Sequence, residues 1–88
     1  NFFNETLGAL YNYDLENDSE LLQTLSVYFD CLGNITQTAK TMYIHRNTIV
    51  YRLEKIKEIL NTTLLNAEEN FNFQLALKIY RLLYPKHE

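Results

Sequence analysis

The segment "YIHRNTIVYRL", residues 43–53, gathers the side chains of this sequence that are best suited to chemistry. His45 could act as a general base, with Thr48 or Tyr51 as the group that it activates. Such a pair also needs a third side chain that orients the base, and the segment offers none and matches no hydrolase motif. We therefore expect no enzymatic activity. For His45 we favour a structural position at the start of a helix, bonded to backbone or to a phosphate, over a contact with a base.

The remaining reactive groups are too few and too scattered to form a metal site or to hold a cofactor. The chain has one cysteine, Cys31, and its second histidine, His87, lies far from His45 in the sequence. Metal sites take several Cys, His or carboxylate ligands at short spacings, so we expect neither metal nor cofactor. A lone cysteine is typical of a cytoplasmic protein. The sequence contains no apolar run near 18 residues that would indicate a membrane span. Because the chain begins with Asn1 instead of Met, we expect it to be a piece of a longer protein.

The charges are distributed unevenly along the chain. The net charge is −3, which by itself speaks against nucleic acid as a partner. Residues 1–39 hold six acids and no Lys or Arg, whereas residues 40–57 hold five cations and one acid, a balance of 5 − 1 = +4. Both a solvated helix face and an anion-binding surface produce such a pattern. The basic stretch includes the whole segment 43–53.

Apolar residues recur at helical spacing along the chain, and only two glycines and one proline interrupt them. Asn4 and Asn34 are predicted N-caps, and Gln37 occupies the capping-box position after Asn34. The predicted helices cover residues 4–13, a stretch from 18 or 19 that stops at Gly33, and residues 35–42, 46–60 and 68–83. We therefore predict an all-α fold, a small five-helix bundle that forms one domain over residues 1–88.

Three of these helices carry a long apolar stripe that we expect to face the core. If all three stripes are buried, no large apolar patch is left on the surface. This expectation argues against one possible function, that of a helical protein-interaction or dimerisation module without DNA binding. The stripes are Leu21, Leu25, Tyr28, Phe29 and Leu32; then Ile49, Leu53, Ile56 and Leu60; and finally Phe71, Leu75, Ile79 and Leu82.

An eight-residue helix, a short turn and a longer helix make up the spacing of a helix-turn-helix, here over about residues 34–60. Ala39 supplies the small residue that lets the two helices approach, and Ile44 and Ile49 are placed to reach the core. Tyr43 departs from the pattern, because glycine is usual at that position of the turn. The spacing predicts that the second helix lies in the major groove of DNA.

The side of helix 46–60 opposite its apolar stripe presents Asn47, Tyr51 and Glu54, with Arg46 in the first turn. An amide, a phenol and a carboxylate can hydrogen-bond base edges in the major groove. Arg46 lies at the positive end of the helix dipole, so we expect a phosphate or a guanine to compensate it.

Several of these side chains have a structural alternative to a DNA contact. Asn47 could cap the helix, and Glu54 could pair with Lys57. Arg52 lies nearer the apolar stripe, where a salt bridge to an acid such as Asp30 is an alternative to a phosphate contact. These alternatives stay open.

The stretch "GNITQTAKTMYIHRNTIVYRLEKI" resembles the C-terminal helix-turn-helix of the purine catabolism regulator (PucR) family, which is related to the sugar-diacid regulators. "HRNT" followed by "YRL" is the most specific part, and the unit is more distantly similar to the Fis nucleoid protein. The resemblance implies a sequence-specific DNA-binding domain of a bacterial transcription regulator. It also implies a sensory region on the N-terminal side, which would bind any effector.

The resulting set of DNA-binding residues combines the family motif with the flanks of the two helices. Its partner is double-stranded DNA, and a homodimer is expected in the full-length protein because one helix covers too few base pairs for useful specificity. The set is Thr36, Gln37, His45, Arg46, Asn47, Thr48, Val50, Tyr51, Arg52 and Lys55.

Overall fold

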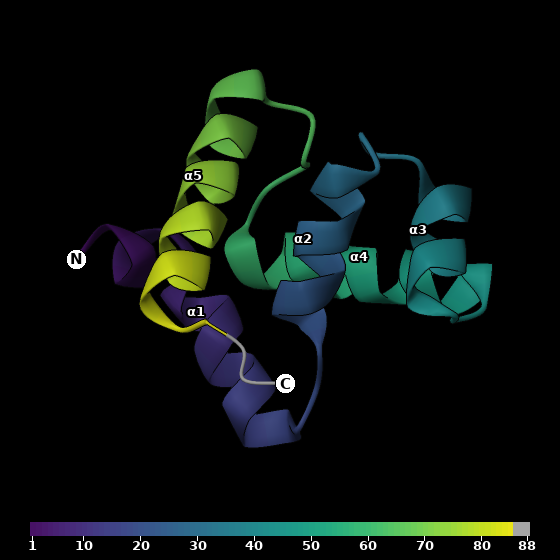
Figure 1. Cartoon of the computed structure of the whole chain (residues 1–88), viewed down its shortest axis with the longest axis horizontal. Helices are drawn as coiled ribbons and strands as arrows, with labels where there is room; N and C mark the ends of the chain where they lie inside the picture. The colour runs from purple at the N-terminus through teal and green to yellow at the C-terminus, as the bar shows by residue number, and fades with distance from the viewer. Residues whose placement is uncertain (86–88) are drawn as a thin grey trace.

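The computed structural model describes residues 1–85, so His87 lies outside the described residues (Figure 1). The helices are α1 Phe2–Asn17, α2 Leu21–Asp30, α3 Ile35–Met42, α4 Arg46–Leu60 and α5 Ala67–Leu83. No strand occurs in residues 1–85, and the prediction of an all-α bundle with five helices is confirmed. None of these helices has the length and apolar character needed to span a bilayer.

α2 lies at the centre of the bundle, because it is the helix that packs against all four others. Leu21 and Leu25 are buried as predicted, and burial of a leucine side chain stabilises a fold by about 1.5–3 kcal/mol. Leu32, predicted to continue this stripe, is instead 93% exposed. The reason is that α2 ends at Asp30, and the chain turns at Leu32 with a positive φ of 54°.

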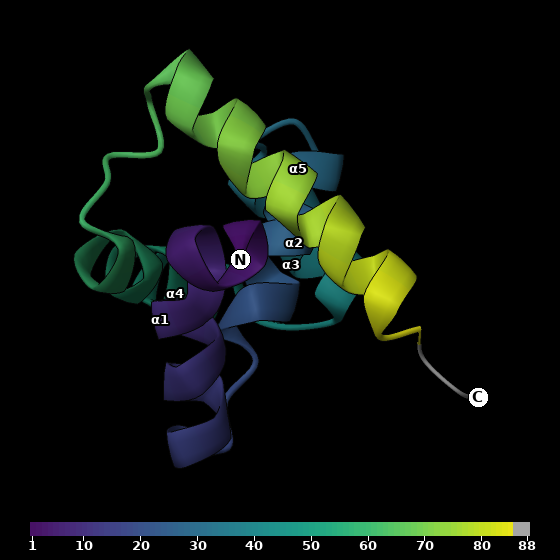
Figure 2. The same cartoon turned by 90° about the vertical axis from the view of Figure 1, so that its left-hand side faces the viewer.

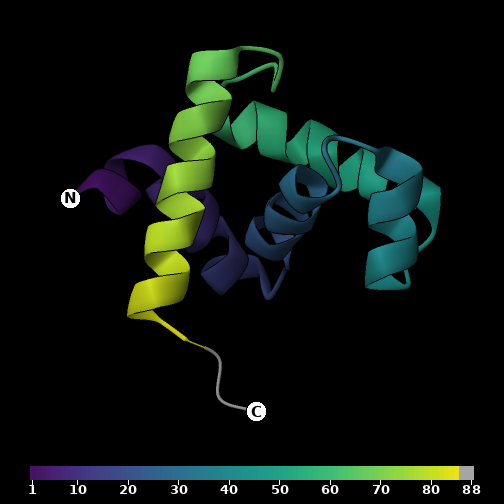
Figure 3. The same ribbon diagram turned by 45° about the horizontal axis from the view of Figure 1, so that its top comes forward.

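The helix-turn-helix prediction is confirmed in its packing. α3 has the predicted bounds, and Ala39 is buried where it meets α4. Ile44 packs half-buried against the core from the turn, and Ile49 is fully buried. Figure 3 shows α4 running across the molecule from the α3 end towards the α5 end.

The predicted core stripe of α5 is wrong. The buried face of α5 is formed by Phe73, Ala76 and Leu77, while Tyr80 stacks on Phe3 of α1 with ring centroids 5.1 Å apart. These contacts fix the rotation of α5 against α1, and Figure 2 shows the start of α1 close to α5. The predicted residues lie on the other side of the helix: Ile79 is half-buried, but Phe71, Leu75 and Leu82 are 64%, 42% and 81% exposed.

The predicted starts of the first two helices are also wrong. Asn1, and not Asn4, caps α1, because the Asn4 N–H donates to Asn1 Oδ1 at 2.9 Å. α2 begins at Leu21 instead of at residue 18 or 19, and its N-cap residue Glu20 makes no side-chain cap.

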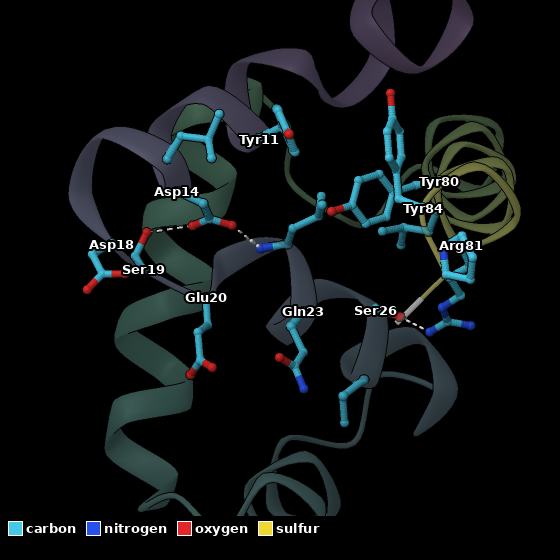
Figure 4. Close-up of a pocket in the computed structure, with 15 residues that line it drawn as sticks. Tyr11, Asp14, Asp18, Ser19, Glu20, Gln23, Ser26, Tyr80, Arg81 and Tyr84 are labelled. Carbon is cyan, nitrogen blue, oxygen red and sulfur yellow. Dashed lines mark hydrogen bonds between the residues drawn. The ribbon is translucent and has the colours of Figure 1, made fainter. Parts of the chain in front are cut away.

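Asp14 of α1 caps α2 from a distance in sequence (Figure 4). Its carboxylate accepts hydrogen bonds from the Leu21 N–H at 2.9 Å and from the Leu22 N–H at 2.8 Å. Ser19 Oγ donates to the same carboxylate at 2.5 Å. The central helix is therefore anchored to α1 at its first turn.

Asn34 is the N-cap of α3, as predicted, and its Oδ1 accepts from the Gln37 N–H at 2.8 Å. The side chain of Gln37 does not complete the capping box and instead donates to Thr41 Oγ1 at 3.5 Å. At the other end of α3, Tyr43 adopts the left-handed conformation with φ 58° and ψ 42°. The Ile44 N–H then donates to Ala39 O at 3.0 Å, which closes a Schellman-type turn without glycine.

Replacing Asp14 with alanine should lower the free energy of unfolding by about 1–2 kcal/mol, because the first turn of α2 loses its acceptors. Urea denaturation followed by circular dichroism measures the change. The matched control is Glu16→Ala, an exposed acid of the same helix, for which a change within about 0.5 kcal/mol is expected. Equal losses in both variants would contradict the capping role.

Tyr43→Gly should be more stable than Tyr43→Ala by about 1 kcal/mol, because only glycine adopts the left-handed conformation without steric strain. The comparison uses thermal and urea unfolding of the two variants, which both lack the ring. A Tyr43→Ala variant as stable as Tyr43→Gly would show that the turn carries no strain.

Candidate nucleic-acid interface

His45 is the N-cap of α4. Its Nδ1 accepts a hydrogen bond from the Asn47 N–H at 3.0 Å, so the ring is held by the backbone, and the alternative that Asn47 caps the helix is wrong. The Thr48 N–H donates to the backbone oxygen of His45 at 3.0 Å, but within residues 1–85 the imidazole of His45 makes no hydrogen bond with the side chain of Thr48 or Tyr51. Among residues 1–85, no group of three His, Cys, Asp or Glu side chains is arranged to hold a metal ion.

The outward face of α4 is polar and open to solvent. Arg46, Asn47, Tyr51 and Glu54 are exposed along it, and Tyr51 is 69% exposed. Val50 is half-buried beside them. This face offers a guanidinium, an amide and a phenol within the first two turns of the helix, the kinds of groups that read base edges.

Two cations further along α4 are already paired. Lys57 Nζ lies 2.9 Å from the Glu54 carboxylate, which confirms the structural alternative for Glu54. Lys55 Nζ lies 3.5 Å from Glu58 and 5.4 Å from the ring centroid of Tyr13. Only part of the +4 balance of residues 40–57 is therefore available to an anion.

Arg52 is engaged inside the fold, although not with the predicted acid. Its Nη1 donates to Thr24 Oγ1 at 3.1 Å and lies 3.8 Å from the Glu20 carboxylate. Asp30 lies instead 3.4 Å from Arg81 of α5. The prediction missed this partner because Thr24 is 28 positions away in the sequence.

Seven of the ten predicted DNA-binding residues lie in two groups on different sides of the helix-turn-helix. The first group lies on the flank of α4 that faces the end of α1 and the start of α2, where a hollow of about 370 Å³ is also lined by Asp18 and Glu20. These two acids make this flank unfavourable for phosphate. The members of the first group are Thr48, Tyr51, Arg52 and Lys55.

The second group consists of Thr36 and Gln37 of α3 and Arg46 of α4. Together with Lys40 of α3, these residues form what we name the basic edge. All four side chains are exposed, and neither helix has an acid in its first turn. In residues 1–85, Lys40 and Arg46 take part in no ion pair. Two cations and two helix N-termini therefore point their positive potential to solvent.

Two residues near the basic edge were absent from the predicted set. Lys40 counted towards the charge of residues 40–57 but was assigned no contact. Tyr43 was noted only as a departure from glycine, yet its side chain is 96% exposed in the turn between α3 and α4. Turning helix 35–42 by 100° per residue would have placed Lys40 on the same face as Thr36.

A larger groove of about 700 Å³ lies between α1, α2 and the end of α5, away from the basic edge (Figure 4). Tyr11, Tyr80 and Tyr84 line it. Burial raises the pKa of Tyr80, and the neighbouring Tyr11, Tyr84 and Asp14 side chains raise it further. Asp14 caps α2, and Arg81 donates to Ser26. The polar groups named here serve the scaffold.

Known proteins resemble this chain over most of its length, including the helix-turn-helix. Residues 21–79 match the family described as the PucR C-terminal helix-turn-helix domain. The purine catabolism regulatory protein of Bacillus subtilis is 45% identical over 93% of this chain, and the DNA-binding transcriptional activator AdeR of the same organism is 31% identical over 88%. The carbohydrate diacid regulator of Escherichia coli is 32% identical over 74%.

The chain spans only 15%, 18% and 17% of the lengths of these three relatives. Among solved structures, none matches the chain. The match over residues 21–79 nevertheless includes α2, the whole helix-turn-helix and most of α5. With the helix bounds and core contacts predicted for the helix-turn-helix in place, the chain belongs to the family of PucR C-terminal helix-turn-helix domains of transcription regulators.

Proposed function

We propose that this domain binds double-stranded DNA sequence-specifically, with the first two turns of α4 in the major groove and the basic edge against phosphates. The observation that carries the proposal is Arg46, an exposed cation at the positive end of a helix that has no acid in its first turn. Such a placement is unfavourable in the free domain, and a phosphate or a guanine compensates it in a complex.

Each group of residues then has its own role. Arg46, Asn47 and Tyr51 contact base edges, and Val50 is suited to a thymine methyl group. Arg52 and Lys55 hold α4 against α2 and α1 through Thr24 and Tyr13. Phosphates are contacted by Thr36, Gln37, Lys40 and the outer nitrogen of His45, whereas Thr48 lies beside Asp18 and Glu20 and contacts no phosphate.

The role of the whole protein follows from this domain by analogy with its relatives. We infer that it regulates transcription in the cytoplasm of a bacterium, that it acts by binding instead of by catalysis, and that residues 1–88 are its C-terminal piece. A region on the N-terminal side would bind any effector. Because one α4 reads few base pairs, the full-length protein would bind DNA as a homodimer.

Arg46→Ala should weaken binding to a duplex selected from a random library by roughly tenfold to a hundredfold, the range of a lost guanidinium contact with a base. Fluorescence anisotropy at several salt concentrations measures the affinity, with a log–log salt slope of about −2 per domain for Lys40 and Arg46, the two cations of the basic edge. Lys57→Ala removes the same charge further along α4 and should change affinity far less. A slope near zero, or equal losses in both variants, would contradict the proposal.

Two substitutions at His45 separate its cap from its proposed phosphate contact. His45→Asn keeps a side-chain acceptor at the N-cap, so stability should stay within about 0.5 kcal/mol of wild type, whereas His45→Ala should cost about 1 kcal/mol. Both variants lose the outer nitrogen and should bind DNA more weakly by a similar factor. Full DNA affinity in His45→Asn would leave His45 with the capping role alone.

A further inference from the structure

The face of α5 that points away from the core carries an apolar stripe. Phe71, Leu75 and Leu82 lie on it at i, i+4 and i+11, with exposures of 64%, 42% and 81%. Lys78 occupies the i+7 position between them. We name these four residues the outer stripe. α5 therefore has two apolar faces: Phe73 and Leu77 face α1, and the outer stripe faces solvent.

The size of the outer stripe sets it apart from scattered surface leucines. Three large side chains with these exposures leave roughly 300 Å² of apolar surface in one strip, a size at which patches on soluble domains are often functional. Further exposed apolar side chains lie at both ends of α5: Leu65 just before it is 87% exposed, and Leu83 in its last turn is 62% exposed.

The outer stripe lies apart from the candidate DNA interface. α5 packs against α1 and α2, and within residues 1–85 it makes no close backbone approach to α3 or α4. Figures 1 and 3 show α5 at the end of the molecule opposite α3. A partner on the outer stripe would therefore leave the basic edge free.

We propose that the outer stripe is covered by α5 of a second copy of this chain, in an antiparallel pair about a two-fold axis. The inference rests on the proposed function, in which two copies read DNA together, and it identifies the surface through which these two copies contact each other. A two-fold pair needs a surface that is complementary to itself, and the positions along α5 meet this requirement.

The spacing along α5 is symmetric about Phe73. Phe71 and Leu75 lie two residues on either side of it, and Glu68 and Lys78 lie five residues on either side. In an antiparallel pair with its axis at this level, each Phe71 faces Leu75 of the second copy. At the same time each Glu68 lies level with Lys78 of the second copy, about 7.5 Å along the helix from the axis.

The ends of α5 favour the same direction. Its first turn is acidic, with Glu68 and Glu69, and Lys78 and Arg81 lie towards its other end. A parallel pair would bring like charges and like dipole ends together, whereas an antiparallel pair brings opposite ones together. In the antiparallel register Leu82 also comes level with the segment of the second copy that contains the exposed Leu65.

Sedimentation equilibrium of the 88-residue chain without DNA tests the proposal. The wild-type chain should dimerise in a concentration-dependent manner, and Phe71→Glu should weaken dimerisation at least tenfold. The control Leu15→Glu places the same charge at a 67% exposed leucine of α1 and should leave dimerisation unchanged. Circular dichroism shows that both variants are folded.

A charge exchange tests the register itself. Glu68→Lys and Lys78→Glu should each weaken the dimer several-fold, and the double variant should restore it. Within one copy these residues lie about 15 Å apart along α5, so they form no pair of their own whose loss and recovery would imitate this result.

The outcomes separate this proposal from DNA binding. A wild-type chain that stays monomeric at all concentrations, a dimer that Phe71→Glu leaves intact, or a Leu15→Glu variant as impaired as Phe71→Glu would overturn the outer stripe as the interface, even if the chain binds DNA. A dimer that shows the expected pattern but binds no DNA would support the interface and contradict the proposed function.

Discussion

The position of every other helix depends on the anchoring of α2, a helix of only ten residues. Its own first turn offers no side-chain cap, so Asp14 of α1 supplies one. Its buried face includes the hydroxyls of Thr24 and Ser26, and a buried hydroxyl without a partner is destabilising by about 1–3 kcal/mol. The Thr24 hydroxyl donates to Glu20 O, at the N-cap of α2, at 2.7 Å and accepts from Arg52 of α4, and the Ser26 hydroxyl accepts from Arg81 of α5.

This anchoring uses charge that a DNA-binding domain could otherwise present to phosphates. Arg52 is held beside Glu20, Lys57 is paired with Glu54, and the domain as a whole carries a net charge of −3. The free positive potential is concentrated at the basic edge. Since sequence-independent affinity follows the number of phosphates neutralised, such a domain should bind random DNA weakly and depend on base contacts for its affinity.

Local signals in the sequence were enough to predict α3 and α4. Asn34 sets the start of α3, and the spacing from Ile49 to Leu60 gives one unambiguous buried face. The other errors have physical causes that lie outside a local window. The cap of α2 comes from Asp14 in another helix, and the turns after α2 and α3 place Leu32 and Tyr43 in a conformation usually left to glycine.

The sequence pattern of α5 predicted a helix but the wrong buried face, because apolar residues occur on both sides of it. Periodicity gives the spacing of apolar residues but does not show which of two apolar faces meets the core. In α5, Phe73 and Leu77 pack inward, although the longer stripe runs from Phe71 to Leu82. The same limit applies to Arg52, whose position on α4 was predicted but whose partner was not.

The two proposed surfaces are joined through α2. α4 and α5 make no close backbone approach to each other in the described residues, yet each packs on α2 and is tied to it by an arginine. In a dimer joined at the outer stripe, the distance between the two α4 helices would therefore depend on the packing of α2 between them. Operator half-sites lie about one turn of DNA apart, so a rigid connection of this kind fixes which spacing two copies can read.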